Sequence, residues 1–194
     1  MTDRPRLILA SSSPRRLELL ARIGVVPDLV LAPEVDEAPY PGEVPRRYVE
    51  RIARAKTAAI ATDHSGAVVL AGDTTVAVGR RILGKPADEA DHRSMLELLA
   101  GRRHHCLSAV CVVDAGGTRR ERLSDTVIAF RPLPPATIAA YVAGDEGRGK
   151  AGGYAIQGRA EAWVRHMAGS HSGVVGLPLG ETRALLLAAG IAVD

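Results

Sequence analysis

The chain begins with a short apolar run that stops at three serines and a proline, and two arginines follow directly. The run RLILA, residues 6–10, is typical of a buried strand that ends at turn-forming residues. A helix is expected from Pro14 to Ile23, because Ser13 suits the N-cap, Pro14 the first helical position and Gly24 the stop. This strand–turn–helix unit indicates an α/β fold.

The remaining pattern alternates in the same way, with hairpins in between. Helices are expected at 45–62, 87–100, 134–144 and at the end of the chain, and strands at 25–32, 106–114, 126–130 and 162–167. The run AVVLAGDTTVAV, residues 67–78, is strand-like, but Gly72 and Asp73 are expected to break it, with 80–86 as its hairpin partner. A mixed sheet flanked by helices fits this order, and 194 residues suit one domain, 1–194.

Composition narrows the class of protein. No apolar run is long enough to cross a bilayer or to form the core of a signal peptide, so we expect a cytoplasmic protein with no membrane partner. The net charge of +3 could serve nucleic acid, free nucleotides or neither. Aromatic residues make up only 3%, which argues against a single-strand nucleic-acid binder. Cys106 and Cys111 lie at odd separation in a predicted strand, so a disulfide between them is not expected.

The segment SSSPRR has the composition of an anion site. Free N–H groups and the helix dipole attract negative charge at a helix N-terminus, and serine hydroxyls can donate as well. Arg15 and Arg16 are unfavourable in a first helical turn unless an anion lies among them, and guanidinium groups match phosphate oxygens. A capped helix with two solvated arginines explains the spacing equally well.

The segment AGDTTV offers a carboxylate. If the strand breaks there, Asp73 lies at a strand end, where it can hold Mg²⁺ or take a proton from water. A turn aspartate in a hairpin is the commoner explanation. Asp36 and Glu37 form a carboxylate pair that could share a metal with Asp73, although such a pair is more often a solvated loop. The histidines lack the spacing of a zinc site.

Three further polar residues stand out. Lys85 precedes Pro86, and Lys150 opens a glycine-rich loop that allows close approach of a ligand. In the same loop, Gln157 carries a donor and an acceptor side by side, which matches the N3–H and O4 edge of uracil or thymine. Ordinary surface charges and a loop hydrogen bond are the alternatives, and neither loop has a Walker or dinucleotide-binding pattern.

Taken in order, these motifs resemble one family. From about Arg6 to Leu187 they are SSSPRR, VDE, the lysine of RIARAK, GDT, GKP, KAGGYAIQG and GVVGLPL. Their order is similar to that in the Maf proteins, which are nucleoside triphosphate pyrophosphatases. The resemblance implies an elongated mixed sheet with flanking helices and a central cleft between two lobes, similar to inosine triphosphate pyrophosphatases. It also implies metal-dependent attack of water, with Mg²⁺ or Mn²⁺, that yields a monophosphate and pyrophosphate during housecleaning of nucleotide pools.

The resemblance assigns roles to individual residues. Asp73 matches the catalytic aspartate, as base or metal ligand, and Glu37 matches its metal partner. Ser13, Arg15 and Arg16 belong to the phosphate-binding motif, and Lys56 and Lys85 match lysines that face the phosphates. Arg16, Thr74 and Gln157 match the trio associated with choice of base, here that of the dTTP and UTP branch. A homodimer is expected, because dimers are common among such enzymes.

The chain departs from the family pattern in places. Gly149 stands where the family often has an acid, and His171 and Gly173 replace an aromatic residue and an asparagine. Base preference broader than dTTP and UTP is therefore open. The alternatives are a pyrophosphatase for 7-methyl-GTP or another non-standard purine nucleotide, a general phosphatase, and a basic nucleic-acid-binding regulator of cell division with no metal-dependent turnover.

Overall fold

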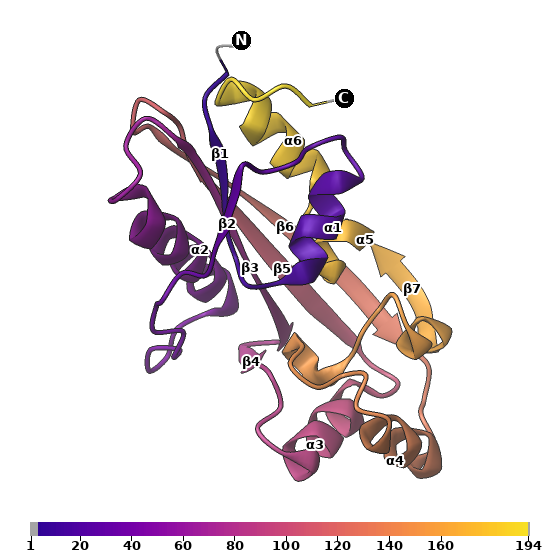
Figure 1. The fold of residues 1–194 in the computed structure, drawn as a ribbon. Coiled ribbons are helices and arrows are strands. Elements are labelled where there is room, and N and C mark those ends of the chain that lie inside the picture. Colours follow the sequence, from indigo (N-terminus) through magenta and orange to yellow (C-terminus); the bar gives the residue numbers. More distant parts are fainter. Residues whose placement is uncertain (1–3, 194) are drawn as a thin grey trace.

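The computed structural model describes residues 4–193, which build one seven-stranded mixed sheet (Figure 1). The strand order is β2-β1-β3-β5-β6-β7, and β4 pairs with β3 beside this path. The strands are β1 Leu7–Ala10, β2 Leu29–Leu31, β3 Val68–Val78, β4 Arg81–Leu83, β5 Arg103–Val113, β6 Arg119–Phe130 and β7 Val164–Ala168. β1 lies parallel to β2 and β3, and the other pairs are antiparallel. The expected mixed α/β sheet is confirmed.

Helices cover both faces of the sheet. They are α1 Pro14–Ala21, α2 Pro45–Ala61, α3 Glu89–Leu99, α4 Pro135–Ala143, α5 His171–Val175 and α6 Leu179–Ala188, with two 3₁₀ turns, η1 Ala151–Gly153 and η2 Arg159–Trp163. α2 packs on one face, against residues such as Ala109 and Cys111. The main core lies on the other face, where it joins the strands to α1, α3, α4 and α6.

The predicted break at Gly72 and Asp73 is wrong. β3 is continuous through both residues, because β5 pairs with it without interruption from Val69 to Ala77. Glycine and aspartate weaken an isolated strand, but a fully paired neighbour supplies the hydrogen bonds that hold them extended. Asp73 therefore lies in mid-strand, opposite Ala109, instead of at a strand end.

Other boundaries differ less. The strand expected at 25–32 is reduced to β2, the strand at 126–130 starts earlier, at Arg119, and α5 replaces part of the expected C-terminal loop. The starts of α1 and α2 at proline agree with the sequence.

Cys106 and Cys111 are both free and lie in clusters on opposite faces of the sheet, as predicted. Within residues 4–193, no helix combines the length and hydropathy needed to span a membrane.

One edge of β3 is left open at its centre. β1 pairs with residues 68–70 of this edge, and β4 pairs with residues 76–78. Between the two, residues 71–75 have no strand partner on that side among the described pairings. We call this stretch the β3 gap. It gives solvent and ligands access to a strand whose opposite edge is held by β5.

Candidate active site

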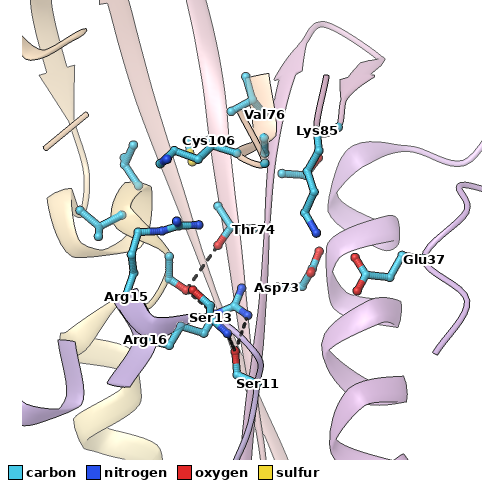
Figure 2. A pocket seen from close by; sticks show the side chains of 18 of the residues that line it. Ser11, Ser13, Arg15, Arg16, Glu37, Asp73, Thr74, Val76, Lys85 and Cys106 are labelled. Carbon is cyan, nitrogen blue, oxygen red and sulfur yellow. Dashed lines mark hydrogen bonds between the residues drawn. The ribbon is translucent and has the colours of Figure 1, made fainter. Parts of the chain in front are cut away.

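A cleft of about 850 Å³ opens at the β3 gap (Figure 2). Its walls come from the β1–α1 turn, the loop before α2, the β4 exit, the glycine-rich loop and the end of α5. Every residue to which the family resemblance assigned a role lines it: Ser13, Arg15, Arg16, Glu37, Lys56, Asp73, Thr74, Lys85 and Gln157. Segments far apart in the chain therefore meet in one cavity, and the individual roles of these residues stay predictions.

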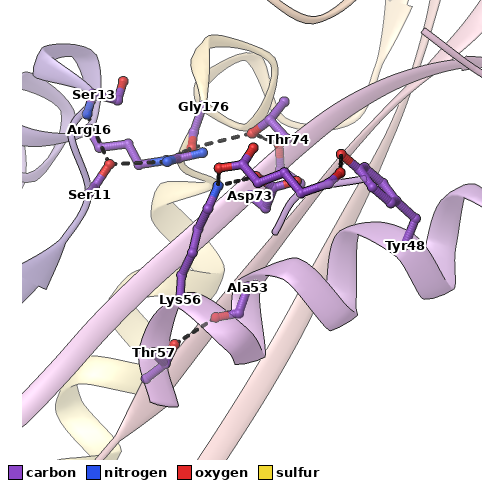
Figure 3. Close-up of polar contacts among 12 residues, drawn as sticks. Ser11, Ser13, Arg16, Tyr48, Ala53, Lys56, Thr57, Asp73, Thr74 and Gly176 are labelled. Atoms are coloured by element: carbon purple, nitrogen blue, oxygen red, sulfur yellow. Dashed lines mark hydrogen bonds and ion pairs between the residues drawn. The ribbon is translucent and has the colours of Figure 1, made fainter. Parts of the chain in front are cut away.

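Two carboxylates share one ammonium at the base of the cleft (Figure 3). Lys56 Nζ lies 2.7 Å from Asp73 Oδ1 and 2.8 Å from Glu37 Oε1. Lys56 and Asp73 are buried, with 9% and 8% of their side-chain surfaces exposed, whereas Glu37 is 42% exposed. Within residues 4–193, Asp73 Oδ2 and Glu37 Oε2 accept no side-chain hydrogen bond. Each carboxylate thus keeps one oxygen for a ligand.

Local structure explains this convergence. Lys56 projects from the buried face of α2, and alternation along β3 turns Asp73 towards the same helix. The loop that carries Glu37 is fastened to α2, since the Tyr48 hydroxyl donates to the Glu37 carbonyl at 3.1 Å. Arg51 Nη2 donates to the Ala38 carbonyl at 3.0 Å in the same loop. The proline-rich loop is therefore a fixed wall of the cleft.

The two carboxyl groups titrate differently. Burial raises the pKa of Asp73, and the charges of Lys56 and Arg16 offset only part of that effect. Burial also disfavours the ionised form of Glu37, but the hydrogen bond and charge of Lys56 outweigh it and lower the pKa of Glu37. A raised pKa suits a group that exchanges protons, and a lowered pKa suits a permanent anion.

Arg16 lines the cleft and also joins α1 to other parts of the protein through hydrogen bonds. Its Nε donates to the Gly176 carbonyl at 2.9 Å, and its Nη1 donates to Ser11 Oγ at 3.1 Å. Burial lowers the pKa of Arg16, against the favourable charge of Asp73. Ser11 also accepts from the Ser13 N–H at 3.1 Å, so it organises the turn, although the sequence did not single it out. Ser13 holds the N-cap position, but its side chain makes no capping bond.

Thr74 points to the opposite face of β3 from Asp73. Its Oγ1 lies 2.8 Å from Ser108 Oγ and 3.4 Å from the Gly176 carbonyl, which is the carbonyl that Arg16 also contacts. Ser108 Oγ donates to the Gly173 carbonyl at 2.6 Å. Two residues of the trio linked to base choice therefore contact the end of α5, and sequence reasoning missed Ser108.

The far wall is built from the β4 exit and the glycine-rich loop. The Gly152 N–H donates to the Gly84 carbonyl at 3.0 Å and joins the two segments. Lys150 donates to the Glu146 carbonyl at 2.6 Å, and burial together with the charge of Arg15 lowers the pKa of Lys150. Gln157 is exposed, and its carboxamide has no hydrogen-bond partner within residues 4–193. Its donor and acceptor are thus available to a ligand.

The residues present fit a divalent cation with few protein ligands. No group of three or more His, Cys, Asp or Glu side chains in the described part of the chain could hold a metal by itself. Asp73 and Glu37 nevertheless converge with one unoccupied oxygen each. Mg²⁺ is commonly held by one or two carboxylates together with substrate phosphates and water. Asp36 does not belong to this set, because it accepts from the Ala38 N–H at 2.9 Å and does not line the cleft.

Comparison with known proteins identifies the family. The model of the Maf-like protein family matches residues 6–189. The chain belongs to this family. Among curated relatives, the dTTP/UTP pyrophosphatase of Sphingopyxis alaskensis is 65% identical to this Maf-like chain over 187 residues, 96% of this chain and 98% of that protein. The dTTP/UTP pyrophosphatase of Novosphingobium aromaticivorans is 55% identical and covers 100% of this chain and 96% of its own length.

Two solved structures share a weaker likeness with the Maf-like chain. The nucleoside-triphosphatase / dITP/XTP pyrophosphatase of Mycobacterium abscessus is 21% identical, with a TM-score of 0.42 over 66% of this chain and 76% of that one. The Staphylococcus aureus Ham1 protein is 17% identical, with a TM-score of 0.47 over 64% of this chain and 71% of that one.

Proposed function

We propose that this Maf-like protein hydrolyses dTTP and UTP to the nucleoside monophosphate and pyrophosphate. The observation that carries the proposal is the cleft at the β3 gap, where Asp73 lies between the cations Lys56 and Arg16 beside a second carboxylate. The names and high identity of the curated relatives support the same reaction.

The charged side of the cleft suits a triphosphate. Arg15, Lys85 and the helix N-terminus behind Ser13 line the same cleft as Asp73 and add donors and positive charge. Guanidinium and ammonium groups bind phosphate oxygens and stabilise the charge that develops on them during phosphoryl transfer. The triphosphate supplies the negative charge that makes two arginines favourable in the first turn of α1.

In this mechanism Asp73 acts on water. Its Oδ1 is fixed by Lys56, and Oδ2 can accept a proton from a water molecule placed against the α-phosphorus. The water oxygen forms the new bond to phosphorus, the bond from the α-phosphorus to the bridging oxygen breaks, and pyrophosphate leaves with that electron pair. Lys56 and Arg16 hold the carboxylate and the phosphates in place throughout.

A divalent cation, Mg²⁺ or Mn²⁺, belongs to this proposal. Glu37 would hold it, and Asp73 would share it where that carboxylate serves as a metal ligand instead of as the base; when bound, the cation would neutralise phosphate charge and polarise the anhydride. Glu37 suits this part, because its lowered pKa keeps it anionic near neutral pH.

The glycine-rich wall of the cleft offers a group that suits a pyrimidine. Gln157 has an amide donor and acceptor for the N3–H and O4 edge, and apolar residues that include Val76 and Val174 line the same cleft. A pocket that hydrogen-bonds one base edge rejects bases that leave its polar groups unpaired. We accordingly propose pyrimidine selection, with purine nucleotides such as 7-methyl-GTP as the competing specificity.

Product analysis by anion-exchange chromatography tests the function. The protein is incubated with dTTP, UTP, CTP, GTP and 7-methyl-GTP in Mg²⁺ or Mn²⁺. We expect monophosphate and pyrophosphate from dTTP and UTP, and a loss of at least about 10³-fold in kcat for Asp73→Asn. Asp36→Asn is the matched control, because Asp36 is an aspartate next to Glu37 but does not line the cleft.

Other products or substrates would favour one of the alternative functions. Orthophosphate in place of pyrophosphate would indicate a general phosphatase, and preferred turnover of GTP or 7-methyl-GTP would overturn the pyrimidine specificity. No turnover together with steeply salt-dependent binding to DNA or RNA would favour the nucleic-acid-binding alternative. The cytoplasmic setting, the absence of a stable nucleic-acid partner, the homodimer and the single domain over 1–194 stay predictions.

A further inference from the structure

Glu37 lies on a loop that has no regular structure of its own. The proline-rich loop, residues 32–44, joins β2 to α2 without a helix or a strand. From this loop the Glu37 side chain points towards Asp73, although 42% of its surface is exposed (Figure 2). A loop without support samples many backbone conformations, and ordering it costs entropy. Contacts that hold the loop therefore affect how well Glu37 can bind a cation.

Arg51 makes several of these contacts from α2. Its Nε donates to Glu43 Oε1 at 2.8 Å, and its Nη2 donates to Glu43 Oε2 at 2.7 Å and to the Ala38 carbonyl at 3.0 Å. The Tyr40 ring lies against the guanidinium group, with 3.9 Å between Arg51 Cζ and the ring centroid. One side chain of α2 thus contacts three residues of the loop.

Glu43 closes the loop at the same place. Only 9% of its side-chain surface is exposed, and it also accepts from the Tyr40 N–H at 3.1 Å. The hydrogen bond from Arg51 lowers the pKa of Glu43, so the pair stays ionised at neutral pH. A bidentate pair between arginine and a carboxylate fixes geometry better than a single contact does. The loop is therefore fastened both to itself and to α2.

These contacts extend to Glu37 itself. The Glu37 carbonyl accepts from the Tyr48 hydroxyl at 3.1 Å, and the next carbonyl, that of Ala38, accepts from Arg51. Two successive peptide groups are thus held by α2, the helix that also carries Lys56. A fixed backbone sets the direction in which the Glu37 side chain leaves the loop, towards Lys56 Nζ at 2.8 Å.

We propose that Arg51 is a positioning residue for Glu37, and that by holding the loop in place it strengthens the binding of a divalent cation at this carboxylate. Arg51 does not line the cleft, so it acts through the loop. A ligand group that is already ordered loses little further freedom when the ion binds. This inference rests on the proposed function, because it takes Glu37 to hold the cation.

The sign of the effect separates positioning from charge. Removing a positive charge from a protein favours the binding of a cation, if it acts at all. Arg51→Met keeps an unbranched apolar stem but loses the charge and all the donors. Because the loop is released, we expect the Kd for Mn²⁺ to rise about tenfold. The Kd is measured from the electron paramagnetic resonance signal of free Mn²⁺, without nucleotide. An unchanged or lower Kd would overturn the inference.

Arg54→Met is the matched control. Arg54 lies one turn further along α2 and also pairs with a glutamate, since its Nε donates to Glu121 Oε2 at 2.6 Å. Within residues 4–193 it makes no hydrogen bond to the proline-rich loop. Its removal changes the charge by the same amount, so we expect a Kd for Mn²⁺ no higher than that of the wild type. Equal weakening in the two methionine variants would overturn the inference.

A double-mutant cycle shows whether Arg51 acts through Glu37. Glu37→Gln removes the carboxylate, and we expect Mn²⁺ to bind more weakly. In this background Arg51→Met should raise the Kd much less than it does in the wild type, because the two residues act on one contact. Losses that add in full would place the effect of Arg51 elsewhere and overturn the inference. A wild type that binds no Mn²⁺ would also overturn it.

Kinetics keep this inference apart from the catalytic proposal. In Arg51→Met the Mn²⁺ concentration for half-maximal pyrophosphate release should rise about tenfold, while the rate at saturating Mn²⁺ stays within about twofold. A variant that is only partly folded would lose rate at every Mn²⁺ concentration, which would count against positioning. A wild type that binds Mn²⁺ but releases no pyrophosphate would refute the catalytic proposal, and the Kd of Arg51→Met would still decide the role of Arg51.

A second substitution keeps the test decisive if Arg51→Met does not fold. Arg51→Lys retains the charge, but an ammonium group lacks the planar fork that serves Glu43 and the Ala38 carbonyl together. We expect the Kd for Mn²⁺ to rise by a smaller factor, about threefold. A Kd equal to that of the wild type in a folded Arg51→Lys protein would overturn the inference.

Discussion

Arg15 and Arg16 are adjacent in the chain, yet only Arg16 is hydrogen-bonded into the protein. Arg16 is buried and donates to the Gly176 carbonyl and to Ser11 Oγ. Arg15 is half-buried and extends into the cleft, and it makes no side-chain hydrogen bond or ion pair within residues 4–193 (Figure 2). One arginine therefore joins α1 to the end of α5, and its neighbour is left for the ligand.

The two arginines should respond differently to substitution. Arg15→Gln is expected to raise KM for UTP about tenfold, with the unfolding midpoint unchanged, because only a ligand contact is lost. Arg16→Gln is expected to lower the free energy of unfolding by about 2 kcal/mol as well, because the Gly176 carbonyl loses a charged donor. Steady-state kinetics and urea unfolding measure both effects. Equal stability losses in the two variants would contradict this division.

Lys56 lies between the two carboxylates and holds them together. Lys56→Gln leaves Asp73 and Glu37 without their shared cation, so the free energy of unfolding should fall by about 3 kcal/mol. Millimolar Mg²⁺ or Mn²⁺ should restore more stability to this variant than it gives the wild type. Thermal unfolding with and without metal measures the difference. If metal stabilised both proteins equally, these carboxylates would not be the site.

The raised pKa of Asp73 predicts the acid side of the pH–rate profile. A general base works only when deprotonated, so kcat/KM should fall as the pH drops through the pKa of this carboxyl. Because burial raises that pKa, the fall should begin at a higher pH than for an exposed aspartate. The profile of Asp36→Asn should match that of the wild type. An activity independent of pH down to the range of an ordinary aspartate would argue against Asp73 as the base.

His104 should make the fold sensitive to acid. It is 1% exposed and packs on Phe130 and Tyr154, and burial lowers its pKa to about 4. Between pH 6.5 and about 4, the unfolded chain binds a proton at His104 that the folded chain does not, so stability falls as the pH is lowered through this window. The full effect is about 3 kcal/mol.

Urea unfolding at several pH values tests the contribution of His104. The free energy of unfolding of His104→Gln should depend less steeply on pH than that of the wild type between pH 6.5 and 4. His105→Gln is the control, because His105 is exposed beside Asp125. Identical slopes for the wild type and His104→Gln would show that another group causes the acid sensitivity.

The sequence predicted the local structure well where the signals are local. Proline at the first helical position marks the starts of α1 and α2, and periodic apolar residues such as Ile52 give α2 the expected length to within one residue. The resemblance of the motifs to those of the family also identified residues that line one cleft in the structure. Strand, turn and cap signals depend on neighbouring residues, so a single sequence contains them.

The sequence alone did not predict which distant segments of the chain contact one another. Gly72 and Asp73 look like strand breakers, and only the presence of β5 keeps them in β3. Arg16 and Gly176 are 160 residues apart, so nothing near Arg16 indicates that it is held by the end of α5. Ser108 lies in an ordinary apolar strand, and only the structure shows that its hydroxyl contacts Thr74 Oγ1 and the Gly173 carbonyl. Ser11 alone had a signal, since it belongs to the same serine run as Ser13.

The β3 gap also bears on aggregation. An unpaired stretch of strand is a template on which another chain can add by backbone pairing. Here β1 and β4 close the gap on both sides after five residues, 71–75, and the buried cations Lys56 and Arg16 line the cleft that opens there. An extended polypeptide cannot run past those neighbouring strands, whereas a small anion can enter between them. The same interruption in pairing thus leaves room for a small anion and keeps out a foreign strand.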